Sequence, residues 1–376
     1  MNAKLFNASL LTACVLLASA SPANAIGYKF TDLGTLGGTF SQALAINNSG
    51  QVVGEANIVG DTMHHATLWN GSTVTDLGTL GGTESTAMAI NNAGLIVGYS
   101  DIVGDISTHA TQWNGSTVKD LGTLGGLGSA AMDINNSGLV VGDDTSTDHI
   151  SHATMWNATT TTYLGTLSGG MSFARGINNA GLMVGYAQTA SEPHPMHATL
   201  WDGSSVTDLG TLGGRDSIAS DINDVGLIVG YSYPVGGATT GDEYHATLWN
   251  GSTVTDLGTL GGRLSTAEAI NNGGQVVGAA YTAANDVFHA TLWDGSAIID
   301  LNTLLDGGTV SAGWILTSAA SINDNGWIVG NAYNSISHET HAFLLAPVPE
   351  PETYALFMAG LGLMGFIARR RKNGQA

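Results

Sequence analysis

The sequence predicts an all-β fold: a seven-bladed β-propeller of four-stranded repeats about 44 residues long. The pentapeptide His-Ala-Thr-x-Trp recurs six times and then once as His-Ala-Phe-Leu-Leu. Two further landmarks keep the same period, and each end of the repeat region holds part of one repeat. Steps of 43 to 52 residues between copies are typical of stacked or radial repeats. The copies begin at His65, His109, His152, His197, His245, His289 and His341.

The two further landmarks exclude chance recurrence of one short word. Leu-Gly-Thr-Leu survives in the last repeat as Leu-Asn-Thr-Leu, and its copies begin at Leu33, Leu77, Leu121, Leu164, Leu209, Leu257 and Leu301. The dipeptide Ile-Asn follows the first six of these leucines by 13 residues, whereas Ile322 comes eight residues late. Its copies begin at Ile46, Ile90, Ile134, Ile177, Ile222, Ile270 and Ile322.

Each repeat reads as four short antiparallel strands. In the second repeat, Gly94 ends a turn that favours positive φ, and Asn114-Gly115 is a strong signal for a two-residue hairpin. The turns divide this repeat into strands at residues 85–90, 95–98, 109–113 and 118–121. Four antiparallel strands in a repeat of this length make one propeller blade.

The ends of the repeat region predict that the ring is closed. Residues 28–32 read as a fourth strand that lacks the first three, and the last repeat holds three strands without a fourth. Pairing the N-terminal strand with the last repeat would complete one blade and leave no open sheet edge.

Small and large side chains recur where a radial fold needs them. The first strand of a blade lines the crowded centre, and an alanine lies three residues before each repeat isoleucine, from Ala43 to Ala319. The tryptophan of each pentapeptide, as at Trp113, is expected to fill the wider space between blades.

The charge balance excludes nucleic acid as a partner. The chain carries a formal net charge of −20. Only five basic residues fall in residues 26–346, and these are Lys29, Lys119, Arg175, Arg215 and Arg263. Nucleic-acid affinity depends on Lys and Arg side chains that neutralise phosphates. An acidic body of this kind is compatible with a soluble exported protein.

Residues 1–25 have the pattern of a secretory signal peptide. Lys4 precedes an apolar run, and Ala23 and Ala25 supply the small residues of the cleavage site. The single cysteine, Cys14, would leave with the signal, so the mature chain is expected to hold no disulfide. The alternative is lipid attachment at Cys14.

Residues 347–376 have three parts. A motif of Val348, Pro349, Glu350 and Pro351 precedes an apolar segment at residues 354–368. A basic cluster of Arg369, Arg370, Arg371 and Lys372 follows it. The segment is shorter than the roughly 20 residues of a spanning helix. With its flanks it predicts a short C-terminal transmembrane helix whose basic end stays cytoplasmic.

This tail closely resembles the PEP-CTERM sorting signal of Gram-negative bacteria. The resemblance implies an exosortase-type membrane protease as partner. It also implies export to the cell surface or extracellular space, with a transient or stable inner-membrane anchor. Residues 26–346 resemble the HAF family of extracellular repeat proteins, through the His-Ala-Thr or His-Ala-Phe segments and the Ile-Asn-x-x-Gly-x-x-Val-Gly between them. That second resemblance implies no known activity.

Residues that occur in every repeat are expected to be structural. The repeat histidines favour a structural hydrogen bond over a ring that binds metal or senses pH. The aspartates before Leu-Gly, such as Asp76, are expected to bond local backbone N–H groups. No cofactor is expected, and calcium, which prefers oxygen ligands, is the alternative.

Candidates for a ligand or catalytic site come from departures within the inner strands. Asp133, Arg175, Asp221 and Glu268 stand at or next to positions where other repeats carry Ala, Leu or Met. They could converge at the axial channel, where paired carboxylates could do acid–base work. The alternative is ordinary solvation in a wet channel, and no catalytic residue or metal ligand is assigned.

The loops between second and third strands vary in length and content. They are expected to share one face with the connections between blades, where binding is usually placed. We therefore expect a non-enzymatic surface or matrix protein that binds an extracellular polysaccharide or a surface protein. The alternative is a propeller hydrolase or lyase acting on extracellular polysaccharide. The variable segments are residues 56–63, 101–108, 143–151, 187–196, 231–244, 281–288 and 305–314.

Overall fold

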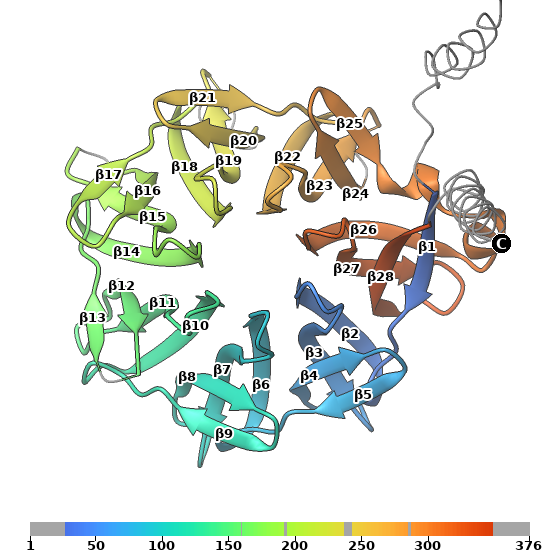
Figure 1. The fold of residues 1–376 in the computed structure, drawn as a ribbon, viewed down its shortest axis with the longest axis horizontal. Coiled ribbons are helices and arrows are strands. Elements are labelled where there is room, and N and C mark those ends of the chain that lie inside the picture. Colours follow the sequence, from blue (N-terminus) through green and yellow to red (C-terminus); the bar gives the residue numbers. More distant parts are fainter. Residues whose placement is uncertain (1–26, 159, 192–193, 237–242, 285–286, 349–376) are drawn as a thin grey trace, which may run out of the picture. The chain divides into compact units, whose positions relative to one another are not determined.

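The strands of the computed structural model form four-stranded units arranged radially around a central opening (Figure 1). The structure describes residues 27–158, 160–191, 194–236, 243–284 and 287–348. Six of its sheets or sheet portions follow the same antiparallel four-strand order, and the last repeat contributes a seventh set. The all-β, propeller-like arrangement predicted from the repeats is confirmed.

Unit 1 shows how each repeat folds. Its strands run outward from the axis in the order β2 (Gly37–Ile46), β3 (Val52–Ile58), β4 (His64–Asn70) and β5 (Thr73–Asp76). A Cβ atom on Gly54 of β3 would lie 1.9 Å from the carbonyl oxygen of Gln42 on β2. The two backbones can approach this closely only because residue 54 is glycine.

Five further units repeat this order. Unit 2 is β6 (Gly81–Ile90), β7 (Ile96–Ile102), β8 (Thr108–Asn114) and β9 (Thr117–Asp120), and unit 3 is β10 (Gly128–Ile134), β11 (Val140–Thr145), β12 (Ser151–Trp156) and β13 (Thr161–Tyr163). Unit 4 is β14 (Ser168–Ile177), β15 (Met183–Thr189), β16 (Met196–Trp201) and β17 (Val206–Asp208). Unit 5 is β18 (Gly213–Ile222), β19 (Ile228–Pro234), β20 (His245–Asn250) and β21 (Thr253–Asp256), and unit 6 is β22 (Gly261–Ile270), β23 (Val276–Thr282), β24 (Phe288–Asp294) and β25 (Ala297–Asp300).

Unit 7 combines the two ends of the repeat region. β26 (Trp314–Ile322), β27 (Ile328–Asn334) and β28 (Thr340–Val348) lie side by side, and β1 (Gly27–Asp32) pairs with β28. The N-terminal strand therefore completes the last unit, as the sequence predicts. A single parallel pair between Phe40 and Thr340 also joins this unit to unit 1 in one larger sheet.

The late isoleucine of the last repeat has a simple structural cause. The extra residues before β26 form a 3₁₀ turn, η1 (Leu301–Leu304), and a short helix, α2 (Gly307–Ser311). The Asp306 carboxylate caps this helix by accepting hydrogen bonds from the backbone N–H groups of Gly308 and Thr309. The insertion thus lengthens the approach to the inner strand and leaves the strand itself in register with the others.

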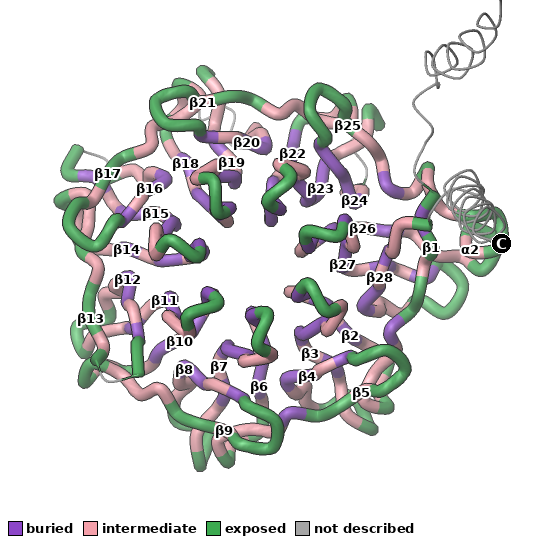
Figure 2. The backbone as a smooth tube through the Cα atoms, viewed as in Figure 1, coloured by how far each residue is buried: buried purple, intermediate pink, exposed green. Residues whose placement is uncertain are grey.

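The core consists of clusters that each join neighbouring units. Trp113 is fully buried and packs with Ala87 and Ile90 of its own unit and with Val53 and Ala66 of unit 1. The inner-strand alanines, from Ala43 to Ala319, are also fully buried. Figure 2 shows buried residues along the inner strands and exposed residues at the turns, in the loops and on the outermost strands such as β5 and β9. The predicted division between small central residues and large residues between units is confirmed.

The described residues contain no helix long and apolar enough to cross a membrane. The signal peptide with Ala23 and Ala25 lies outside the described residues. The same holds for Pro349 to Pro351, the apolar segment at 354–368 and the basic cluster that follows it. Val348 is the last residue of β28 and is exposed.

Candidate functional site

The repeated histidines form structural pairs at the outer strands. In six units the Nδ1 atom of the histidine lies 2.7 to 3.0 Å from an aspartate oxygen on the outermost strand. In unit 2, Asp120 binds His109 and also accepts a hydrogen bond from the backbone N–H of Gly122. Both predictions, of a histidine hydrogen bond and of aspartates that bond backbone N–H groups, are confirmed.

Unit 3 contains the one exception to this pairing in the sequence. Tyr163 stands where other repeats carry aspartate, and its ring centroid lies 4.9 Å from that of His152. Within the part of the chain that the structure describes, no group of three or more His, Cys, Asp or Glu side chains could hold a metal ion. The alternative of bound calcium stays a prediction.

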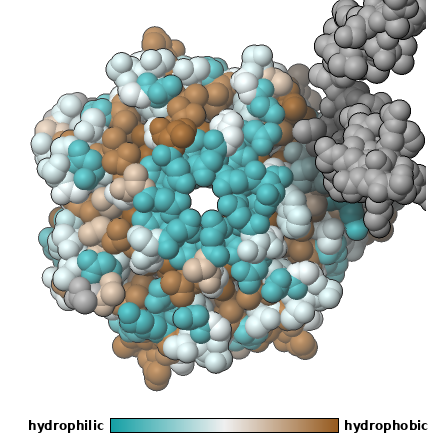
Figure 3. Space-filling view, in the orientation of Figure 1, coloured by the Kyte–Doolittle hydropathy of each residue, from teal (hydrophilic) through white to brown (hydrophobic). Residues whose placement is uncertain are grey.

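One end of the axial channel is ringed by asparagine. Each inner turn presents an Ile-Asn-Asn or Ile-Asn-Asp segment around a cavity of about 190 Å³. Figure 3 shows this end as a hydrophilic ring around the central opening. We call it the asparagine mouth, and its polar residues are Asn47, Asn48, Asn91, Asn92, Asn135, Asn136, Asn178, Asn179, Asn223, Asp224, Asn271, Asn272, Asn323 and Asp324.

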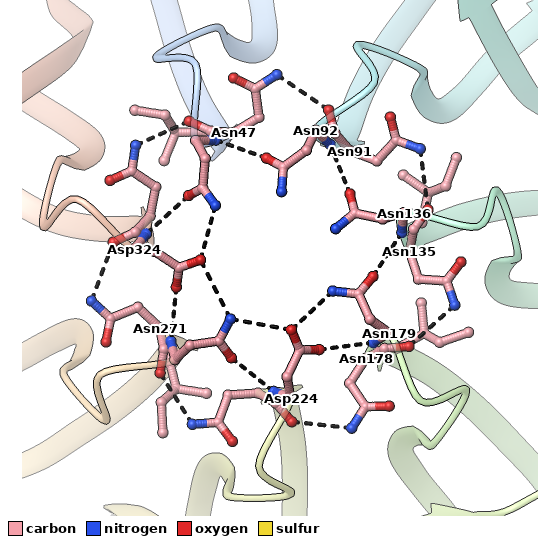
Figure 4. A pocket seen from close by; sticks show the side chains of 18 of the residues that line it. Asn47, Asn91, Asn92, Asn135, Asn136, Asn178, Asn179, Asp224, Asn271 and Asp324 are labelled. Atoms are coloured by element: carbon pink, nitrogen blue, oxygen red, sulfur yellow. Dashed lines mark hydrogen bonds between the residues drawn. The ribbon is translucent and has the colours of Figure 1, made fainter.

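Two rings of hydrogen bonds run around the asparagine mouth and link neighbouring units (Figure 4). In the first, the side-chain amide of each leading asparagine donates to the backbone carbonyl of its counterpart in the next unit, as from Asn91 to Asn135 at 3.1 Å. The ring is closed by Asn323, which donates to the carbonyl of Asn47 at 3.0 Å. The members of this ring are Asn47, Asn91, Asn135, Asn178, Asn223, Asn271 and Asn323.

In the second ring, the backbone N–H of each following residue donates to a side-chain oxygen in the next unit, and Asp324 closes it on Asn48. Burial acts to raise the pKa of Asp224. Hydrogen bonds from Asn179 and Asn272 outweigh it, so the pKa lies below its usual value. The polar groups of the mouth therefore bind one another, which indicates a structural role.

Asp133 and Asp221 join neighbouring units just below this mouth. They directly follow the bulge of the inner strand, at a position where three other units carry alanine. One oxygen of Asp133 accepts the N–H of Ile134, and the other accepts the N–H of Ile177 in the next unit at 2.8 Å. Asp221 bonds Ile222 and Ile270 in the same way.

Burial is the main cause that raises the pKa of Asp133 to about 7, and the nearby charge of Asp221 raises it further. The two aspartates come close because Gly176 lies between them, where an added Cβ would be 3.1 Å from the Cα of Asp221. Burial also raises the pKa of Asp221. Each carboxylate is held by two backbone N–H groups, and neither lines a cavity of the channel.

Arg175 and Glu268, in contrast, do line the channel together. They are the unpaired bulge residues of their inner strands, and both border a cavity of about 360 Å³. A neighbouring cavity of about 300 Å³ shares Met88 and Glu268 with the first. We call the first cavity the axial chamber, and its walls are Met88, Met132, Arg175, Tyr186, Ile218, Ser220, Tyr231 and Glu268.

Aromatic rings hold the guanidinium of Arg175 in place. Its Nη2 donates to the hydroxyl of Tyr186 at 3.2 Å, and its Cζ lies 5.6 Å from the centre of the same ring. Phe173 stacks on Tyr186 with ring centres 4.8 Å apart. A cation over an aromatic face is stabilised by the ring quadrupole. Arg175 is therefore positioned before any ligand arrives.

Two acids of the chamber region, Glu268 and Asp143, interact electrostatically with Arg175. Glu268 faces the channel, yet the surrounding protein displaces enough water to raise its pKa, against the lowering effects of Thr266 and Arg175. Burial raises the pKa of Asp143 to about 6, while Arg175 acts to lower it. Burial, followed by the nearby Tyr233 and then Glu268, raises the pKa of Tyr231 to about 12.

Sequence reasoning missed the second-strand residues of this site. The residue after the glycine of each Val-Gly pair lies opposite the inner strand, as Tyr186 lies opposite Phe173 and Tyr231 opposite Ile218. The signal was present, because these residues vary among the repeats, with tyrosine in three of them, while the preceding Val-Gly pair recurs. They are Glu55, Tyr99, Asp143, Tyr186, Tyr231, Ala279 and Asn331.

The variable loops lie at the opposite end of the inner strands from the asparagine mouth. Several carry an exposed aliphatic residue at the tip, with 50% to 81% of its surface accessible. The valines of three of them lie over a glycine at the start of the inner strand: Val59 over Gly37, Val103 over Gly81 and Val235 over Gly213. These residues are Val59, Val103, Ile106, Val235, Val287 and Ile336.

Comparison with known proteins identifies the tail. Residues 347–372 match the PEP-CTERM protein-sorting motif, which confirms the predicted sorting signal. The motif indicates export with cell-surface or extracellular sorting, and it implies processing by an exosortase-type membrane protease. The HAF-type resemblance of the repeats stays a prediction.

Solved structures share the fold distantly. The chain is similar to a puromycin-hydrolysing peptidase of Mycobacterium tuberculosis, with 11% identity over 85% of this chain and 56% of that chain and a TM-score of 0.50. It is also similar to TolB from Acinetobacter baumannii, with 13% identity, coverage of 80% and 64%, and a TM-score of 0.47. A third similar structure is the Trypanosoma rangeli sialidase in complex with the inhibitor DANA. Its identity is 10% over 89% of this chain and 57% of that chain, with a TM-score of 0.37.

The chain thus spans less than two thirds of each of these three chains. At such identities the likeness to the peptidase concerns the fold alone. No curated protein matches the chain.

Proposed function

We propose that this protein is an exported seven-bladed β-propeller that acts as a non-catalytic binding module at the cell surface or in the extracellular matrix. An exosortase-type protease sorts it through the tail, whose apolar segment holds it in the inner membrane before processing. The sorting motif at residues 347–372 supports the export part of the proposal. Seven strand sets and two closed hydrogen-bond rings support the blade count.

One observation carries the binding role: the repeat is broken at the axial chamber. Alanine, isoleucine and asparagine recur on either side of the positions held by Arg175 and Glu268. At these positions the seven units carry Leu, Met, Met, Arg, Ser, Glu and Ala, and at the second-strand positions of Tyr186 and Tyr231 they carry Glu, Tyr, Asp, Tyr, Tyr, Ala and Asn. A frame that is constant in structure and variable at one cavity is what a binding scaffold needs.

The placement of the carboxylates favours binding over acid–base catalysis. A hydrolase or lyase at this site would need two carboxyl groups facing one substrate, one to donate and one to accept a proton. Glu268 faces the chamber, whereas both oxygens of Asp133 and of Asp221 accept backbone hydrogen bonds. The three carboxylates therefore do not converge on one pocket.

The test uses residues 26–348, because residues 28–347 form one compact body with its own core clusters. Thermal melts with soluble extracellular polysaccharides, their oligosaccharides and divalent ions should reveal a ligand, since a molecule that binds only the folded state raises the melting temperature. Tyr231→Ala should remove that shift, whereas the loop variant Val103→Ser should keep it. Chemical conversion of the ligand during incubation, or an undiminished shift with Tyr231→Ala, would overturn the proposal.

A further inference from the structure

Resting on the proposed function, we propose that the axial chamber binds the terminal ring of a neutral saccharide, which enters from the loop end of the channel. The inference concerns the chemical class of the ligand and its direction of entry. The inference rests on three features of the site. These are its charges, its combination of polar and apolar wall groups, and the difference between the two ends of the channel.

The one cation that lines the chamber is compensated within the protein. Arg175 lies close enough to interact electrostatically with both Glu268 and Asp143, and its guanidinium also bonds the hydroxyl of Tyr186. An anionic ligand would approach Glu268 and find the one cation already compensated. An amine would approach Arg175. Like charges brought together in a confined site discriminate against both classes.

The walls of the chamber offer both hydrogen-bonding groups and apolar surface. Glu268 provides acceptor oxygens, Arg175 provides donors, and the Tyr231 and Ser220 hydroxyls provide both. Met88, Met132 and Ile218 supply apolar surface beside the Tyr186 and Tyr231 rings. A pyranose ring has the matching character, because its hydroxyl groups lie around the edge while its C–H bonds cover the two faces.

The size of the site agrees with a sugar ring. The axial chamber has a volume of about 360 Å³, and the adjoining cavity that shares Met88 and Glu268 has about 300 Å³. Ligand pockets commonly fall between about 300 and 1,000 Å³. The chamber thus suits one or two rings, and the rest of a longer chain would extend out of it.

The two ends of the channel differ in what they offer to such a chain. At the asparagine mouth, the side-chain amides of the leading residues are engaged with the neighbouring units, as at Asn91 and Asn135. At the loop end the aromatic wall continues outward, because Tyr231 lies 5.1 Å from Tyr244 and Tyr244 lies 5.9 Å from Tyr233, measured between ring centres. Aromatic rings offer flat contact surface at low entropic cost. The loop end is therefore the side on which further sugar units find contacts.

The test is calorimetric titration of residues 26–348 with three panels of matched length. These are neutral hexose and N-acetylhexosamine di- and tetrasaccharides, the same sizes carrying a uronic acid, and the same sizes carrying a free amine. The best neutral ligand should bind at least about tenfold more tightly than its charged counterparts. Glu268→Gln, which keeps the shape and an acceptor oxygen, should change neutral binding by less than about fivefold and should strengthen uronate binding.

Two variants test the direction of entry and protect against loss of folding. Tyr244→Ala should weaken binding of the tetrasaccharide and leave binding of the disaccharide unchanged. Equal losses of affinity for both ligands would overturn the proposal that the chain enters from the loop end. Tyr231→Phe keeps the ring but removes a hydroxyl, so it should weaken neutral binding without abolishing it, whereas Ser220→Phe should abolish it by filling the chamber. The melting curve of each variant shows whether it is folded.

The outcomes separate the two proposals. Tighter binding of the uronate or amine panel overturns the neutral-saccharide inference and leaves the binding module standing. If a folded Ser220→Phe variant still binds the ligand, the ligand lies elsewhere, and the assignment of the binding site to the axial chamber is overturned. If no saccharide binds the wild-type protein while another molecule does so in the broader thermal screen, only the saccharide inference fails.

Discussion

Asp32 and His341 lie 309 residues apart in the chain, yet the His341 Nδ1 atom is 3.0 Å from the carboxylate of Asp32. Five other units make the same bond within one continuous repeat, at a separation of 11 residues. Here the bond connects β1 with β28. The backbone N–H of Leu33 donates to the carbonyl of Ala342 at 2.9 Å beside it.

The Asp32–His341 pair should make stability depend on pH. Burial acts to raise the pKa of Asp32, but the hydrogen bond from His341, the N–H of Gly34 and the charge of His341 together outweigh it, so this pKa is lowered. The hydrogen bond with Asp32 is also the main cause that raises the pKa of His341. The histidine contribution is lost as pH rises through its raised pKa, and the aspartate contribution is lost as pH falls through its lowered pKa. His341→Ala should therefore cost most between about pH 4 and 6.5, by about 1 kcal/mol because Asp32 is partly exposed.

Urea denaturation of residues 26–348 across this pH range measures the effect. His152→Ala is the matched control, because Tyr163 replaces the aspartate partner in that unit. A loss in His341→Ala that is the same at every pH would contradict the role assigned to the pair.

Adjacent asparagines of one turn should respond differently to the same substitution. Asn91→Asp keeps the oxygen that accepts from Ala93 and Leu95 but removes the amide that donates to Asn135 of the next unit. Losing one partner of a buried hydrogen bond costs about 1–3 kcal/mol. We expect this loss in the free energy of unfolding from urea denaturation.

Asn92→Asp is the control within the same turn. Its oxygen accepts from the backbone N–H of Asn48, which an aspartate oxygen can also do, and units 5 and 7 carry Asp224 and Asp324 at this position. Its free energy of unfolding should stay within about 0.5 kcal/mol of the wild type. Equal losses for the two variants would contradict the first hydrogen-bond ring.

The close approach of β2 and β3 makes Gly54 intolerant of any side chain. Gly54→Ala would place a Cβ 1.9 Å from the carbonyl oxygen of Gln42, and backbone cannot give way cheaply inside a sheet. We expect a loss of more than about 3 kcal/mol, or failure to obtain folded protein. Gly307→Ala, where a Cβ meets nothing within 4 Å, should melt like the wild type.

Asp133 should lower stability as pH rises. Its pKa is raised to about 7 in the folded protein, so the stability that it contributes is full at low pH and is lost as pH rises through that value. Asp133→Ala copies the alanine of three other units and removes this dependence. The wild type should therefore lose its advantage over the variant between about pH 4, the ordinary pKa of an aspartate in the unfolded chain, and about pH 7. If the free energy of unfolding of the wild type, relative to that of the variant, instead increased with pH in urea titrations, this assignment would be contradicted.

Much of the fold could be predicted because the same residue types recur at the same positions of each repeat. His109, Trp113 and Asn114-Gly115 mark strand starts, buried positions and turns at the same places in each unit, and residues 28–32 could be assigned only to the incomplete last unit. Two inner-strand candidates, Arg175 and Glu268, do border the same cavity. The other two do not, because residues 133 and 221 follow the bulge and their carboxylates accept backbone N–H groups of the next unit, and bulges leave no signal in spacing.

The position of β1 in the last unit has a consequence for biogenesis. A chain that is synthesised and exported from its N-terminus delivers β1 first, but the strand that binds it ends at Val348. Until nearly all of the body has crossed, units 1 to 6 form an open arc with an unpaired edge, and contacts of such long sequence separation form slowly. The sorting tail begins where that last strand ends. A pause at the membrane before cleavage would give the arc time to close, so the released molecule would leave without an exposed edge.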